Sequence, residues 1–326
     1  MANKPGFDGD FTITDVENIS NQWSVFPNNK SIAFNGVIGQ CQLTVAGAAP
    51  DLSFGANAGG TVEPKMSFCA WIKSPFGTWP MAAYISIATK SSSVTPSEYN
   101  WFINTDGLMQ FFLQDVTFTP MIYASETAVT IPPGQWTHVC VTYDGTLLAS
   151  GIQFYVNGVP VATTAAAPTV PPYGGMHATA AEFAIGRLYG DLTTNVSEGF
   201  IDELAAFKKK LSADEVAEVY NSGAAFDFNT FSSVADLVSW WRMGDKATGV
   251  SPNFTIPDQV GSNDAVMSAF LGDSTSGVVA DTGTGAITSL PITQVPISLA
   301  SKGILFRNRS KPYLVSNGGT PDDIII

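Results

Sequence analysis

In this 326-residue chain, Asp202 and Glu203 are adjacent carboxylates, a pair of residue types that could supply acid–base chemistry at a single site. A glycoside hydrolase needs two carboxyl groups on the same side of its substrate. The segment 199–204 has the composition of a strand, and neighbouring residues of a strand point to opposite faces of the sheet. We therefore expect that these two carboxylates do not act on one substrate.

Histidine, the usual proton acceptor beside a nucleophile, occurs at only two positions, His138 and His177. His138 lies in a strand-like run beside Trp136, which favours a structural role. The chain has no glycine-rich phosphate loop and no pair of helical metal ligands. The sequence therefore predicts no catalytic residue and a protein that is not an enzyme.

Carbohydrate sites on β-sandwiches use aromatic side chains with acids and amides, on loops or on a concave sheet face. The candidates in this chain are Trp79, Tyr99, Trp101, Tyr123 and Tyr173. Packing in the core or at an interface is the alternative for each of them. The tryptophans that lie within strand patterns are expected in the core: Trp71, Trp136, Trp240 and Trp241.

Strands are the elements that must position these residues. Apolar groups alternate with a period of two over 136–143 and again over 152–156, on both faces. Asn157-Gly158 then supplies the pair that a type I′ hairpin turn favours. One helix is predicted over 212–222, because Ser212 and Glu215 form a capping box and Gly223 can end it. The pattern is typical of an all-β sandwich whose central sheet is covered on both sides.

Charge limits the classes of partner. The chain has 15 basic and 28 acidic residues, and its net charge of −13 opposes nucleic-acid binding. No apolar run reaches the roughly eighteen residues that predict a membrane span, and the N-terminus has no apolar core of a signal peptide. Charged residues make up 13% of the chain, about half the usual share, as expected of a protein packed against neighbours.

Three cysteines, Cys41, Cys69 and Cys140, are an odd number without the spacing of metal ligands. Cys69 and Cys140 lie in apolar strand patterns, so we expect small buried side chains that are not paired. Unpaired cysteines fit synthesis in a reducing cytoplasm.

The segment 134–158 resembles the laminin-G/pentraxin-like family of concanavalin A-like jelly rolls. In that family a strand W-x-H-V-x-V-T-Y-D-G precedes a hairpin F-Y-V-N-G-V, which this chain matches from Trp136 and from Phe154. Further pieces of the family pattern stand in order at 31–36, 67–73, 87–90, 106–113, 183–186, 199–204 and 211–216. The resemblance implies a concanavalin A-like jelly-roll β-sandwich.

The same resemblance implies a structural Ca²⁺, the one cofactor expected. The family often holds this ion between an early Phe-Asp-Gly turn and a late Ile-Asp-Glu strand, with backbone carbonyls completing the oxygen shell. The matching positions are Asn35, Gly36 and Asp202, and Asn35 replaces the usual aspartate, which weakens the expected affinity. The alternative is that Asp202 hydrogen-bonds to a neighbouring turn. Glycosidases of this fold carry Glu-x-Asp-x-x-Glu, and no such triplet occurs here.

The expected organisation is an N-terminal arm (1–30), a sandwich (31–236), further strands (237–272) and a C-terminal extension (273–326). Residues 237–272 resemble the opening of a second laminin-G-type unit, but no second core strand follows. Two or three strands cannot bury a core of their own, so folding back onto the sandwich is favoured over a separate lobe. The extended terminal arms, ending in the apolar Ile324-Ile325-Ile326, are expected to mediate assembly.

The segments 240–245 and 258–263 look most like laminin-G-type proteins of bacteriophages. That resemblance implies a virion structural protein, a capsid decoration or fibre component made in the host cytoplasm. Its expected partners are other virion proteins, copies of itself and, through lectin-like adhesion, glycans. A stand-alone carbohydrate-binding module is the alternative, and a degenerate glycoside hydrolase is a weaker one.

Overall fold

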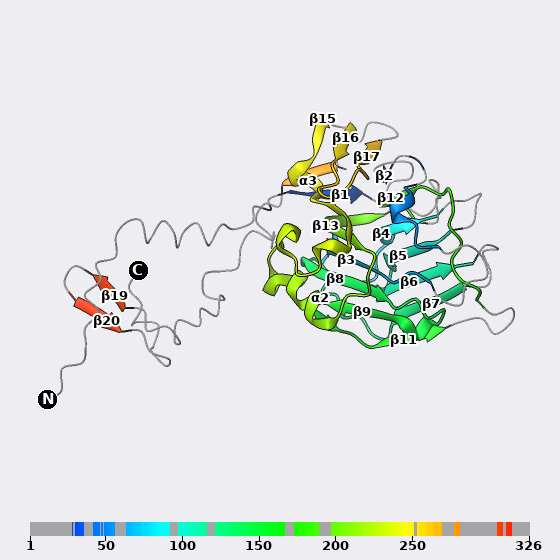
Figure 1. Ribbon diagram of the computed structural model, residues 1–326. Coiled ribbons are helices and arrows are strands. Elements are labelled where there is room, and N and C mark those ends of the chain that lie inside the picture. Colours follow the sequence, from blue (N-terminus) through cyan, green and yellow to red (C-terminus); the bar gives the residue numbers. More distant parts are fainter. Residues whose placement is uncertain are drawn as a thin grey trace. The chain divides into compact units, whose positions relative to one another are not determined.

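Two antiparallel β-sheets packed face to face form the body of this computed structural model (Figure 1). The structure describes residues 28, 30–35, 42–45, 47, 49–55, 63–91, 97–115, 121–166, 173–188, 197–250, 253–268, 277–280, 305–308 and 311–314. The chain divides into two compact units, and residues 26–288 form the unit that contains the sandwich. The stacked sheets with short helices confirm the predicted all-β jelly-roll sandwich. The predicted N-terminal arm falls almost entirely outside the described residues.

The first sheet is centred on β3 and β8, which pair in register from Met66–Tyr143 to Ile72–Thr137. Its strand order is β10, β9, β8, β3, β13, β1 and β18, and β14 pairs with the end of β13. The bounds are β1 (Lys30–Asn35), β3 (Met66–Lys73), β8 (Thr137–Tyr143), β9 (Ile152–Val156), β10 (Val159–Pro160), β13 (Glu198–Phe207), β14 (Leu237–Trp241) and β18 (Gly277–Ala280).

The second sheet has the order β11, β7, β6, β5, β4, β12, β2, β17, β16 and β15. Neighbouring strands from β4 to β7 follow one another along the chain, so this part of the sheet is a meander. The bounds are β2 (Gln42–Val45), β4 (Ile85–Lys90), β5 (Tyr99–Ile103), β6 (Met109–Gln114), β7 (Met121–Glu126), β11 (Thr163–Ala166), β12 (Phe183–Ile185), β15 (Thr248–Val250), β16 (Asn253–Ile256) and β17 (Ala265–Ser268).

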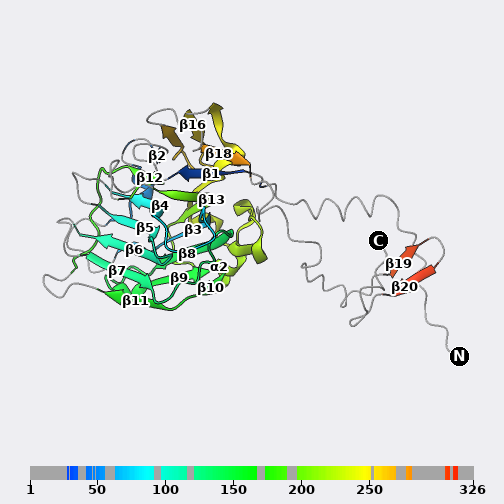
Figure 2. The same cartoon turned by 180° about the vertical axis from the view of Figure 1, so that it is seen from behind.

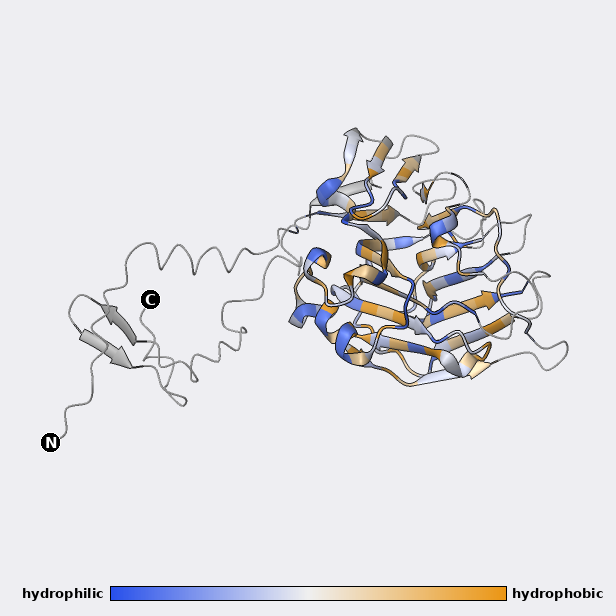
Figure 3. Cartoon of the chain, viewed as in Figure 1, coloured by the Kyte–Doolittle hydropathy of each residue, from blue (hydrophilic) through white to orange (hydrophobic). Residues whose placement is uncertain are grey.

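Apolar side chains that alternate along the strands meet between the two sheets and form the main core. Hydrophobic residues, orange in Figure 3, recur along the strands of both sheets. The ring centroid of Phe68 on β3 lies 6.2 Å from that of Trp101 on β5 and 6.5 Å from that of Phe111 on β6. These rings join the two sheets at the centre of the sandwich.

The outer face of the first sheet is covered by α2 (Ala213–Tyr220) and by the segment that follows it. Val216 and Val219 of α2 pack with Phe228 and Phe231 against this face, in a second apolar cluster. Every residue of β8 is consequently buried, which confirms the prediction of a sheet covered on both sides. The other short helices are α3 (Met243–Lys246) and the 3₁₀ turns η1 (Pro50–Leu52), η2 (Ala149–Gly151), η3 (Asn221–Gly223), η4 (Phe228–Thr230) and η5 (Val234–Asp236). No described helix is long and apolar enough to cross a membrane.

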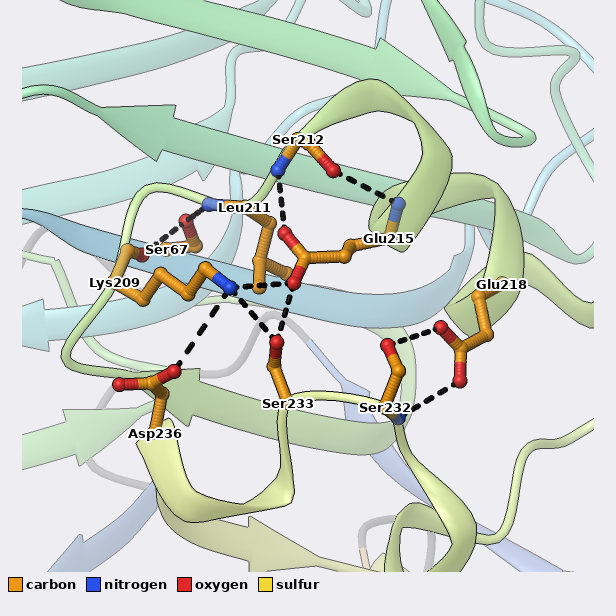
Figure 4. Close-up of polar contacts among 9 residues, drawn as sticks. All are labelled: Ser67, Lys209, Leu211, Ser212, Glu215, Glu218, Ser232, Ser233 and Asp236. Carbon is orange, nitrogen blue, oxygen red and sulfur yellow. Dashed lines mark hydrogen bonds and ion pairs between the residues drawn. The ribbon is translucent and has the colours of Figure 1, made fainter.

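The capping box predicted from sequence sets the start of α2 (Figure 4). The backbone N–H of Glu215 donates to the Ser212 hydroxyl, and the backbone N–H of Ser212 donates to Glu215 Oε2 over 2.8 Å. The helix ends at Asn221, a left-handed cap two residues before the predicted Gly223. The reciprocal pair satisfies two N–H groups that a helix start leaves without partners.

Glu215 also ties the helix to the rest of the sandwich. The Lys209 ammonium lies 2.5 Å from Glu215 Oε1 and donates to the Ser233 hydroxyl, which itself donates to Glu215 (Figure 4). Burial works against the charge of Glu215, but the hydrogen bonds from Lys209, Ser212 and Ser233 hold its pKa down at about 2. One carboxylate therefore joins the helix start to the turns on either side of it.

Cys69 and Cys140 form a disulfide, so the prediction that they are unpaired was wrong. They lie directly opposite each other on β3 and β8, with 4.1 Å between their Cα atoms. The alternation of the sequence shows that each side chain is buried, but only the register between the strands brings the two sulfurs together. By contrast, the hairpin at Asn157-Gly158 has the predicted turn, because both residues have positive φ (48° and 78°).

Residues beyond 236 contribute strands to both sheets. β14 pairs with β13, and β15, β16 and β17 extend the second sheet through β2. β18, beside β1 in Figure 2, belongs to the first sheet although it lies inside the predicted C-terminal extension. The extension therefore starts after the last sandwich strand rather than at residue 273. In the other unit, β19 (Leu305–Asn308) and β20 (Lys311–Leu314) form a two-stranded hairpin.

The Glu215 network predicts a specific pH dependence. We expect Glu215→Gln to lower the free energy of unfolding at pH 7 by about 1–2 kcal/mol, through loss of the cap and of a half-exposed ion pair. The native pKa of Glu215, about 2, is below the ordinary 4.5, so the stabilisation is complete above pH 5 and lost as the pH falls toward 2. Urea unfolding from pH 7 to 2 should show the free energies of unfolding of the unsubstituted protein and of Glu215→Gln converging. The matched control is Asp214→Asn, an exposed carboxylate of the same helical turn. If both variants changed the free energy of unfolding equally at every pH, the hydrogen-bond network around Glu215 would be contradicted.

The disulfide predicts how many cysteine thiols an alkylating reagent can modify. Protein purified without reductant, then denatured and alkylated, should gain one adduct per chain, on Cys41, and three after reduction. Intact-mass spectrometry distinguishes these results. Three adducts without reductant would restore the expectation of unpaired cysteines.

Candidate functional site

The outer face of the second sheet, the side turned away from the first sheet, carries a set of aromatic and amide side chains. On β6, Phe111 and the residues two positions before and after it point into the core, so the residues between them, Gln110 and Phe112, point outward. On β7, Ile122 and Ala124 point into the core, so Tyr123 points outward. Of these outward residues, Gln110, Phe112 and Tyr123 are at least partly exposed, whereas Gln114, the last outward residue of β6, is buried.

An aromatic row crosses this face from β4 toward β11. The edge of Tyr84 meets the ring of Phe102 at 5.5 Å between centroids. Phe102 and Phe112 then stack at 5.5 Å with 1° between their planes, and Phe112 and Tyr123 stack at 5.3 Å with 19°. Exposure rises along the row from 2% at Phe102 to 37% at Tyr123. The row is thus anchored in the sheet at one end and accessible at the other.

The neighbour of Tyr123 on β11 leaves this ring accessible. Ala166 lies directly opposite Tyr123 in the strand register, and its side chain is a single methyl group. Thr164, the next outward residue of β11, lies opposite Ser125 and is exposed. The open end of the aromatic row is therefore bordered by small side chains.

Amides flank the aromatic row on both sides. Asn100 lies opposite Phe112 on β5, and it is fully buried with neither amide atom hydrogen-bonded among the described residues. Gln114, two residues after Phe112, has a buried Oε1 that also finds no partner in the described part of the chain. Gln110 and Ser125 lie opposite each other on the other side of the row and are partly exposed. Buried amide atoms without partners are rare, and they need an explanation at this face.

Of the five aromatic candidates from the sequence, only Tyr123 lies on this face. Tyr99 and Trp101 are fully buried in the core between the sheets, so neither can contact a sugar at the surface. Tyr173 is also buried, and its hydroxyl donates to Glu63. Trp79 is partly exposed in the loop after β3, where its indole N–H donates to the Ile131 carbonyl.

Sequence reasoning missed Phe112 and its flanking amides. The run Phe111-Phe112-Leu113 is apolar throughout, which hides the alternation that would have marked Phe112 as outward. Among the predicted core tryptophans, Trp71, Trp240 and Trp241 are buried. Trp136 is only partly buried: it precedes β8, and its ring meets Phe200 edge-on at 6.3 Å.

A β-bulge overturns the expectation that Asp202 and Glu203 point to opposite faces. Asp202 lies opposite Trp71 and Ala205 opposite Cys69, so one extra residue is inserted in β13. Leu204 points into the core, which makes Glu203, at φ 46°, the inserted residue. Both carboxylates consequently lie on the covered side of the first sheet.

The partners of these carboxylates give them a structural role. Glu203 is buried and accepts hydrogen bonds from the Trp240 indole over 2.6 Å and from Arg242 Nε over 3.1 Å. Asp202 is buried and accepts from the Asn28 amide and from the Glu203 backbone N–H, each at 2.8 Å. Protein donors thus hold both groups away from the surface.

The residues implied for Ca²⁺ do not fit an ion. Asn35 lies opposite Glu198, four positions before Asp202, which separates the two by about 13 Å along the strand. An ion held at about 2.3–2.6 Å from each ligand cannot bridge that separation. The oxygens of Asp202 already accept hydrogen bonds from protein groups, and Gly36 lies outside the described residues. No cluster of three His, Cys, Asp or Glu side chains suited to a metal occurs in the described part of the chain.

His138 is a buried structural residue, as the sequence predicted. Its ring lies against Trp71 at 5.4 Å and Tyr220 at 5.9 Å, between β8 and α2. Burial lowers its pKa to about 3, so the imidazole is neutral at physiological pH.

Solved structures with a similar fold share little sequence with this chain. A candidate carbohydrate-binding protein from Bacteroides ovatus is 14% identical with a TM-score of 0.50; the match covers 80% of this chain and 62% of that one. A heptameric SAP-like pentraxin from Limulus polyphemus is 18% identical with a TM-score of 0.42, covering 81% and 98%. The CBM40 of a Ruminococcus gnavus IT-sialidase is 13% identical with a TM-score of 0.36, covering 48% and 83%.

No curated protein matches the chain significantly. A family model does: residues 47–217, more than half of the chain, match the concanavalin A-like lectin/glucanases superfamily. This match agrees with the two stacked antiparallel sheets and with the motifs around residues 134–158. The chain belongs to the concanavalin A-like lectin/glucanases superfamily.

Proposed function

We propose that this protein binds carbohydrate on the outer face of its second sheet, over β5, β6, β7 and β11. The observation that carries the proposal is the aromatic row that ends at the accessible ring of Tyr123. The face of an aromatic ring is electron-rich and attracts the polarised C–H groups of a sugar. Binding sites of this kind combine such apolar surface with a few polar groups that fix orientation.

The partly exposed Gln110 amide and Ser125 hydroxyl beside the row supply those polar groups. A single exposed aromatic residue is ordinary on a protein surface, so Tyr123 alone would not indicate a site. Gln110 and Ser125, however, place an amide and a hydroxyl at the surface on one side of the row. An amide both donates and accepts, as a sugar hydroxyl does.

A binding role without catalysis agrees with the rest of the molecule. Asp202 and Glu203 are buried and hydrogen-bonded on the covered side of the other sheet. The protein of Bacteroides ovatus that shares this fold is itself a candidate carbohydrate-binding protein. That likeness concerns the fold, so the assignment depends on the residues of the outer face.

The proposal is tested on the aromatic row. Tyr123→Ala should reduce affinity for a glycan identified on an array by about tenfold or more, equivalent to about 1.4 kcal/mol. The physical reason is the loss of the accessible ring face. Isothermal titration calorimetry measures the affinity, and an unchanged melting temperature shows that the variant is folded.

The matched control is Phe76→Ala. Phe76 is 50% exposed, more than Tyr123, and lies in the loop after β3, away from the row. The Phe76→Ala variant should leave the affinity for the glycan unchanged. If substitution of Phe76 or Trp79 by alanine abolished glycan binding while Tyr123→Ala retained it, the site would lie in that loop instead. Absence of binding to any glycan would contradict the proposal.

The place of this binding face in a virion is a second proposal. The resemblance of residues 240–245 and 258–263 to phage proteins and the 13% content of charged residues support a structural component that packs against virion proteins and copies of itself. The carbohydrate face would then serve adhesion of the particle. Co-purification of the chain with particles through a density gradient is the expected result; a chain found only in the particle-free fraction would contradict it.

A further inference from the structure

The outer face that we assign to carbohydrate carries no carboxylate and no cationic side chain in its described central part. The outward residues over β6, β7 and β11 are amide, hydroxyl, ring or small apolar groups: Gln110, Phe112, Gln114, Met121, Tyr123, Ser125, Thr164 and Ala166. None of these side chains is a carboxylate, an ammonium, a guanidinium or an imidazole. The face is therefore neutral at physiological pH, in a chain of net charge −13.

The charged groups around this face are turned inward or already paired. Glu126 of β7 is buried and accepts hydrogen bonds from the Met109 backbone N–H and the Thr130 hydroxyl. Arg187, beyond β12, forms an ion pair with Glu182 at 3.3 Å. The charged residue that follows Gln114 is Asp115, a carboxylate that accepts from the Gly174 backbone N–H.

Recognition of an acidic sugar needs a cation. Carboxylates and sulfates are bound by arginine forks or lysine ammonium groups, which supply paired or charge-assisted hydrogen bonds. The described part of this face offers none, and its neighbouring Asp115 repels an anion. An acidic ligand would lose its hydration without compensation from a charged partner.

We propose that the ligand of this face is an uncharged glycan, bound by stacking on Tyr123 and by hydrogen bonds between its hydroxyl groups and the exposed polar side chains beside that ring. This inference rests on the proposed function and names its ligand class. A pyranose ring with equatorial hydroxyls presents a C–H face to the phenol ring and hydroxyls at its edge to Gln110 and Ser125. Such binding depends little on salt, because no charge pair contributes to it.

The test uses pairs of glycans that differ in charge: lactose against sialyllactose, which adds one acidic sugar, and methyl-esterified against de-esterified oligogalacturonate. These are titrated into the full chain together with neutral β-glucan, galactan and mannan oligosaccharides, at 50 and 500 mM NaCl. We expect binding among the neutral ligands, at least tenfold weaker binding of the acidic member of a pair, and less than a twofold change with salt. Tyr123→Ala should weaken the neutral binding about tenfold or more.

Failure of this inference differs from failure of the proposed function. Tyr123-dependent binding confined to acidic glycans, or weakened several-fold by salt, would overturn the neutral ligand class and leave carbohydrate binding in place. No binding of either class would overturn both.

A variant that adds a cation gives an independent check. Thr164→Lys places an ammonium on the exposed outward position of β11, opposite Ser125. It should raise the affinity ratio of acidic to neutral ligand at least threefold at 50 mM NaCl, and less at 500 mM. The matched control is Thr164→Gln, which is uncharged and should leave the ratio unchanged. An unchanged ratio in Thr164→Lys would show that charge does not determine selection at this face.

Discussion

The packing of the two sheets against each other is the constraint on which the rest of this structure depends. Rings such as Phe68 and Trp101 fill the space between the sheets, and their burial supplies the main favourable term in folding. The central strands of both sheets therefore give about every second residue to the core. Only the other half of the residues remains free for covering elements or for a ligand.

The outward residues of the two sheets have different surroundings. The first sheet is covered by α2 and the aromatic segment after it, so the outward residues of β8, and Cys69 opposite Cys140 on β3, are as buried as the core. The helix is held there by the Glu215 network as well as by its apolar side. Over β6 and β7 of the second sheet, the outward residues Gln110, Phe112 and Tyr123 are at least partly exposed. The candidate binding face follows from this asymmetry.

The bulge in β13 shows how tertiary packing can override a local rule. Regular alternation would have placed Asp202 and Glu203 on opposite faces, and the inserted residue brings both to the covered side. There Glu203 meets Trp240 and Arg242, which arrive from β14 and the residue after it. Glu203, one of the pair that first suggested catalysis, contributes instead to attaching β14 to the sheet, and Asp202 binds the Asn28 amide.

The sequence by itself determined the features that depend on neighbouring residues: the strand periodicity, the Asn157-Gly158 turn and the capping box at Ser212. It also identified the family, through motifs confined to single strands and hairpins. Only the tertiary structure decided which candidates are accessible. Tyr99, Trp101 and Tyr123 look alike in sequence, but the face turned to the core is set by the opposing sheet. The Cys69–Cys140 bond and the row from Phe102 to Tyr123 likewise depend on strand register, which relates residues far apart in the chain.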